Sequence, residues 1–128
     1  MKILKNILIQ EADILTKNNH RYKLKTLKKI AKNINDKGCY GNFGTVQQLD
    51  ICENLQLDQI AFSCINARCI DRKYLYCDIQ ILDTPLGNLL NKMDINDIYF
   101  GLVGTGKLKE NFEIYDYEFC RIDAYRRN

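Results

Sequence analysis

Residues 78–90, which read DIQILDTPLGNLL, are the stretch that decides the fold. Apolar and polar side chains alternate up to Ile81, which is typical of a β-strand with one buried face. Thr84 and Pro85 then suit a helix start, with Thr as the N-cap and Pro at the first helical position. The stretch therefore predicts a strand that runs directly into a short helix ending near Met93.

The neighbouring segments predict a hairpin and one longer helix. Apolar residues alternate at 60–64 and again at 75–81, and the turn signal at 71–73 joins the two strands as a hairpin. Between residues 24 and 34, apolar residues recur every three or four positions and lysines fill the other faces. This spacing predicts an amphipathic helix that ends at Gly38.

The remaining segments predict further strands. We expect one or two strands over 2–15, a strand over 98–103 that is broken by Gly104-Thr105-Gly106, and a strand over 112–122. Strands therefore dominate, with two short-to-medium helices between them. The predicted fold class is α+β, a mainly antiparallel β-barrel or sheet, in one domain that spans residues 1–128.

Composition argues against several classes of function. No apolar run reaches the roughly 18 to 20 residues that a membrane-spanning helix needs, and we expect no membrane partner and no signal peptide. The net charge is +3, and the basic residues gather at 17–37 and in the tail without forming a basic stripe interleaved with aromatic residues. This distribution favours a solvated helix face over a nucleic-acid site.

The cysteines and the one histidine give no metal or catalytic pattern. None of the six cysteines forms a C-x-x-C pair, so we expect neither a metal nor a cofactor, and without a secretory signal we expect no disulfides. Cys64 and Cys77 fall in alternating apolar patterns and are predicted to be small buried residues. His20 lies in a predicted exposed turn, which favours a non-catalytic role.

A glycine-rich string at 101–107 fits the phosphate-loop pattern G-x-x-x-x-G-K. Leu108 stands where that motif needs Ser or Thr to hold Mg²⁺, and a strand rather than a helix follows. The string therefore predicts a turn between strands. The carboxylates, Asp78 among them, are predicted to face solvent or cap turns, and no two of them form an evident acid and base pair.

Taken in order, these segments resemble the prohead, or capsid maturation, serine proteases of tailed phages. Residues 17–22 are similar to the family's segment before its first helix, and 78–90 resembles its ILDTP-x-G-x-x-L motif. Residues 101–106 stand where the family has G-V-S-S-R-G. The resemblance spans residues 11–124 and implies a herpesvirus-assemblin-like β-barrel with flanking helices.

The resemblance also places the family's catalytic positions on this chain. Thr45 occupies the position of the catalytic His, Cys64 lies in the counterpart of the Val-Ser-His strand, and Val103 and Gly104 replace the Ser pair that contains the nucleophile. A protease of this type needs both a nucleophile and a base. The sequence therefore predicts a catalytically inactive member with no catalytic residue, which is not an enzyme.

For such a member the resemblance implies a structural or protein-binding component of a phage particle or its assembly. Its partners would be capsid, scaffold or a second copy of the chain, as a homo-oligomer, in the virion or the host cytoplasm. Two alternatives stay open: a phage protein that binds or inhibits a host factor, and a repurposed cysteine-dependent enzyme.

Overall fold

The computed structural model describes residues 2–44 and 55–127. Strands dominate it, and two α-helices and two short 3₁₀ helices lie between them. In chain order the elements are β1 (Ile3–Glu11), α1 (Leu24–Lys37), β2 (Tyr40–Gly41), η2 (Leu57–Gln59), β3 (Phe62–Ile70), β4 (Tyr74–Ile81), α2 (Pro85–Asn91), η3 (Ile95–Asp97), β5 (Ile98–Leu108) and β6 (Ile114–Arg126).

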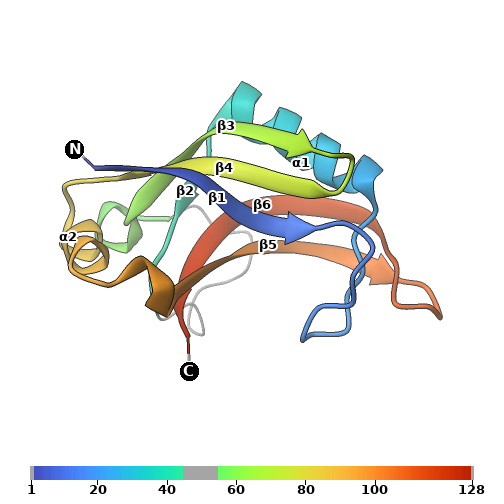
Figure 1. Ribbon diagram of the computed structural model, residues 1–128. Coiled ribbons are helices and arrows are strands. Elements are labelled where there is room, and N and C mark those ends of the chain that lie inside the picture. The colour runs from blue at the N-terminus through green and yellow to red at the C-terminus, as the bar shows by residue number, and fades with distance from the viewer. Residues whose placement is uncertain (1, 45–54, 128) are drawn as a thin grey trace.

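The strands form two antiparallel sheets that curl around one core as a half-barrel. The larger sheet has the order β1-β4-β3-β2, and the ribbon of β5 and β6 lies across its inner side (Figure 1). Two isolated parallel bridges join β6 or the residue before it to segments near the larger sheet: Phe43 to Ala124 at one end and Arg21 to Glu113 at the other. The predicted α+β class is confirmed, and the barrel takes this open, curled form.

Alternation along the strands explains which residues make the core. In β4, Leu75, Cys77, Ile79 and Ile81 all point inwards and are buried, as the predicted pattern requires. The predicted hairpin is confirmed as β3 and β4. The inward residues of both sheets meet in one cluster, which includes Ile9, Phe62, Phe100, Ile114 and Ile122.

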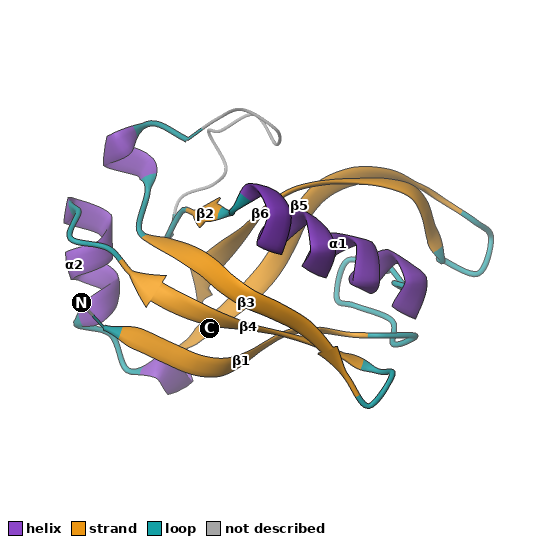
Figure 2. Cartoon of the chain, turned by 90° about the horizontal axis from the view of Figure 1, so that it is seen from above, coloured by secondary structure: helices purple, strands orange, loops and turns teal. Residues whose placement is uncertain are grey.

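Helix α1 flanks the larger sheet beside β3 (Figure 2). The buried side of α1 consists of Leu27, Ile30, Ala31 and Ile34, and Gly38 ends the helix at a φ of 79°. Near the end of α1, the side chain of Asn35 donates to the carbonyl of residue 67 at 2.8 Å and accepts from its N–H at 2.9 Å. The predicted helix is confirmed, and this two-way contact fixes it to β3.

The ILDTP-x-G motif forms a corner between β4 and α2. The hydroxyl of Thr84 accepts the Gly87 N–H at 2.9 Å, as the predicted N-cap does, and donates to the carbonyl of Ile60 at 2.5 Å. A Cβ on Gly87 would lie 1.9 Å from the carbonyl oxygen of Leu82, so no larger residue fits there. The motif therefore joins α2 to the strand before it and to the segment that leads into β3.

The prediction of a turn at Gly104-Thr105-Gly106 is wrong, because β5 runs without interruption through these residues. Glycines at this point let β6 bulge against β5. The last strand starts at Ile114 rather than Phe112, since Phe112 has a φ of 65° in the turn before it. In the described part of the chain, no helix has the length and apolar character that crossing a bilayer requires.

Candidate functional site

The middle of the β5–β6 ribbon carries Val103 and Gly104, the two residues predicted to replace the family's serine pair. Val103 is buried and pairs with Arg121, whereas Gly104 pairs with Phe119, so β6 has one extra residue between them. A Cβ on Gly104 would lie 2.4 Å from the carbonyl oxygen of Glu118. Gly104 therefore lets the bulge of β6 approach β5, in the way that bulges commonly need glycine.

A buried ion pair lies on β6 next to these positions. The Nε of Arg121 donates to the two carboxylate oxygens of Asp123 at 3.0 and 3.1 Å. Arg121 is 3% exposed and Asp123 is 0% exposed. Across the ladder, Arg121 faces Val103 and Asp123 faces Gly101. A buried charge of this kind needs partners at close range, because leaving water is costly for both groups.

Asp123 also holds the chain that leads towards the family's histidine position. The backbone N–H of Asn42 donates to Asp123 Oδ1 at 2.9 Å, and Ala124 donates its N–H to the Asn42 carbonyl at 2.9 Å. Asn42 itself is 3% exposed and donates from its side chain to the carbonyl of Gln59. Thr45, the position predicted to replace the histidine, lies outside the described residues.

This cluster of Asn42, Arg121 and Asp123 was missed by the sequence reasoning. Residues 121–124 are buried on both faces of β6, so the alternation of apolar and polar residues does not predict a buried charge pair there. One signal was present: opposite charges two positions apart, on the same side of a strand that is otherwise apolar there. Their partner at residue 42 is 81 positions from Asp123, which no local pattern reveals.

Cys64 lies in β3, in the larger sheet, while Val103 and Gly104 lie in the ribbon. Its thiol belongs to a buried row with Cys39 and Cys77, and hydrogen bonding to both, together with burial, raises the pKa of Cys64. A raised pKa disfavours the thiolate, which is the nucleophilic form. The prediction that Cys64 and Cys77 are buried is confirmed, and this setting gives no support to a cysteine-dependent enzyme that uses Cys64.

Two other cysteine and histidine predictions have different outcomes. Cys120, in β6, is disulfide-bonded, so the expectation of no disulfides is wrong at this residue. His20 closes the predicted turn but is half-buried rather than exposed: its N–H donates to the Thr16 hydroxyl at 3.1 Å and its ring meets Tyr22 edge to face. Neither residue is in the cluster around Asp123.

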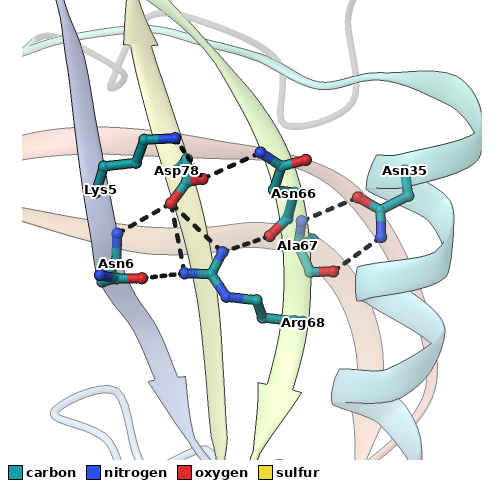
Figure 3. A network of polar contacts seen from close by, with 7 residues as sticks. All are labelled: Lys5, Asn6, Asn35, Asn66, Ala67, Arg68 and Asp78. Carbon is teal, nitrogen blue, oxygen red and sulfur yellow. Dashed lines mark hydrogen bonds and ion pairs between the residues drawn. The ribbon is translucent and has the colours of Figure 1, made fainter.

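A second polar cluster surrounds Asp78 on the outer face of the larger sheet (Figure 3). Its carboxylate accepts the Asn6 N–H at 3.0 Å and the Asn66 amide at 3.1 Å, and Arg68 and Lys5 lie 3.4 and 3.6 Å away. The Asn6 N–H, then Asn66, and the two cations lower the pKa of Asp78 from 3.8 to about 2. The carboxylate is ionised at neutral pH, so it suits a structural role better than that of a general acid.

Two bulges bury this carboxylate, which is 4% exposed although it was predicted to face solvent or cap a turn. The register shifts between residues 4 and 7 of β1 and between residues 65 and 68 of β3, on either side of Asp78. Asn6 and Asn66 take positive φ values of 57° and 53° at these shifts. The bulges bring polar groups of both neighbouring strands, β1 and β3, over the carboxylate, and alternation alone does not predict this.

Comparisons with known proteins agree with this architecture. No protein-family profile matches the chain, and no curated protein matches it. Among solved structures, the fold is similar to that of the capsid assembly protease gp21 of bacteriophage T4, with a TM-score of 0.73 and 14% sequence identity. The match covers 100% of this chain and 92% of the protease chain. The chain therefore has a prohead-protease-like fold, and at this identity the likeness concerns the fold alone.

The prediction that this chain is not an enzyme is wrong as a conclusion from the sequence. A solved structure that matches its whole length is a protease, and nothing in that likeness shows a loss of activity. That Cys64, Val103 and Gly104 replace the family's catalytic residues stays a prediction.

Proposed function

We propose that this chain acts in the assembly of a phage particle, in the virion or the host cytoplasm, by binding a protein of the assembling shell. That protein is the capsid protein, the scaffold or a second copy of the chain. The observation that carries the proposal is the fold likeness to a capsid assembly protease over essentially the full length of both chains. Coverage on both sides means that the whole architecture is alike, rather than one common motif.

A groove between α1 and β6 supports protein binding. It has a volume of about 390 Å³ and is lined by Thr26, Lys29, Ile30 and Asn33 of α1 and by residues 116–119 of β6. The α1 residues follow the spacing of one helix face, while four consecutive β6 residues include both faces of the strand. The groove therefore runs along the edge of β6 beside the helix, a setting suited to a segment of another protein.

The test combines binding and cleavage. The purified chain is mixed with the major capsid and scaffold proteins from the genome that encodes it, association is measured by light scattering after gel filtration, and intact masses are followed over time. We expect a complex with at least one of the two proteins or a defined self-association. The absence of any complex, of self-association and of cleavage of either protein would together overturn the proposal.

A groove variant with a matched control sharpens the result. Asn33→Arg adds a long charged side chain to the groove wall, whereas Asn91→Arg makes the same substitution at an exposed helical position, the last residue of α2. We expect the complex to weaken at least tenfold with Asn33→Arg and less than threefold with Asn91→Arg. Equal effects of the two variants would exclude the groove as the contact.

A further inference from the structure

The outer face of α1 carries four lysines at neighbouring positions. Lys25, Lys28, Lys29 and Lys32 follow the spacing i, i+3, i+4 and i+7, on the side opposite the buried residues of the helix, and all four are exposed. We call them the lysine face. With Leu24 they line a shallow hollow of about 480 Å³ on the surface of the helix.

The lysine face is mostly not neutralised by the protein itself. Over residues 2–44 and 55–127, no ion pair involves Lys25, Lys28 or Lys29, and Lys32 pairs with Asp36 one turn further on. Lys23, just before the helix, differs, because it pairs with Asp13 and Glu113. Like charges at these spacings repel one another, so the binding of an acidic group lowers the electrostatic free energy of the lysine face.

We propose that the lysine face is the docking surface for an acidic segment of a protein partner, an inference that rests on the proposed assembly function and names the chemistry of the partner. Carboxylates of the segment would meet the ammonium groups, and an apolar side chain would lie against Leu24 and the aliphatic stems of the lysines. Glu118, on the far wall of the α1–β6 groove, repels such a segment and confines it to the outer face of α1.

The side chains favour a protein over a nucleic acid. The face offers lysine stems and one leucine, with neither an arginine nor an aromatic ring among its lining residues. Single-stranded nucleic acids bind with the help of rings that stack on the bases, and arginine is the usual reader of guanine in a duplex. Carboxylates on an amphipathic segment match a face that combines positive charge with an apolar floor.

The test uses poly-L-glutamate as the acidic polypeptide and a mixed-sequence 20-base-pair DNA duplex as the competing polyanion. The variant Lys25→Glu/Lys28→Glu/Lys29→Glu reverses the face. Lys2→Glu/Lys17→Glu/Lys92→Glu makes the same change in net charge at three exposed lysines elsewhere. Lys and Glu have similar helix propensities, so α1 persists, and circular dichroism verifies it.

We expect the unmodified chain to bind poly-L-glutamate more tightly than the duplex, with an affinity that falls as salt rises. Binding should weaken at least tenfold in the helix variant and less than threefold in the control. No binding of poly-L-glutamate, equal losses in the two variants, or tighter binding of the duplex would each overturn the inference. The readout needs no capsid protein, so it can fail while the assembly function stands.

Discussion

Asp123 and Asp78 are both buried carboxylates, but they differ in where they lie and in which groups surround them. Asp123 is 0% exposed in the core, with Arg121 beside it and the N–H of Asn42 donated from a distant segment. Asp78 is 4% exposed on the outer face of one sheet and is covered by groups of the two adjacent strands, including the long side chain of Arg68.

This difference shows that the buried fraction of a charged side chain does not by itself determine how much the side chain contributes to stability. Asp123 connects β6 of the ribbon to residue 42, next to the larger sheet, so its loss loosens the closure of the half-barrel. Asp78 connects three strands that already pair with one another through their backbones. Partners of Asp78 such as Lys5, whose side chain is 64% exposed, also have water as an alternative.

The largest effect is expected for Asp123→Ala. Because the change leaves the buried Arg121 guanidinium without this carboxylate, we expect the free energy of unfolding to fall by about 3–5 kcal/mol. Urea unfolding followed by circular dichroism measures it. Asp123→Asn keeps an acceptor for the Asn42 N–H, so its stability should lie between those of the unmodified chain and Asp123→Ala. A loss below about 1 kcal/mol for Asp123→Ala would remove the distinction drawn here.

Asp78→Ala should cost less, about 1–3 kcal/mol, the usual penalty when buried hydrogen-bonding groups lose a partner. The same urea measurement applies. The backbone N–H of Asn6 loses its acceptor, whereas Arg68 and Lys5 can turn to water. A cost for Asp78→Ala equal to or above that for Asp123→Ala would reverse the ranking of the two clusters.

Lowering the pH should remove the stability difference between the unmodified chain and an Asp78 variant within a defined window. The folded pKa of about 2 lies below the ordinary 3.8, so between these values the unfolded state binds more protons and stability rises with pH. The Asp78 contribution is therefore complete above about pH 4 and disappears as the pH falls through about 2. Urea midpoints of the unmodified chain and Asp78→Asn should converge over that window, and a constant difference would contradict the lowered pKa.

The smallest effect is expected for Lys5→Ala. Its ammonium group lies 3.6 Å from Asp78 and is largely exposed, so the ion pair is screened by water and salt. We expect a change below about 1 kcal/mol that shrinks further in 0.5 M NaCl. A larger, salt-insensitive loss would indicate that Lys5 is an essential cover of the carboxylate.

Local pattern was enough for much of this fold. The 3.6-residue spacing over 24–34, the alternation at 75–81 and the Thr84-Pro85 start predicted α1, β4 and α2, because these signals depend on residues that are close in the chain. At Gly104 the local pattern predicted a turn, but the residue lies within a strand. Glycine is needed there because the bulge of β6 leaves no room for a side chain.

For the candidate site, the sequence by itself determined the order of elements that carries the resemblance, and the placing of Cys64, Val103 and Gly104 at the family's catalytic positions stays a prediction. Only the tertiary structure decided that Asp123 is buried with Arg121 against Asn42. The physical reason is that a buried charge is specified by partners that fold close to it, and here the donor at residue 42 lies 81 positions away along the chain.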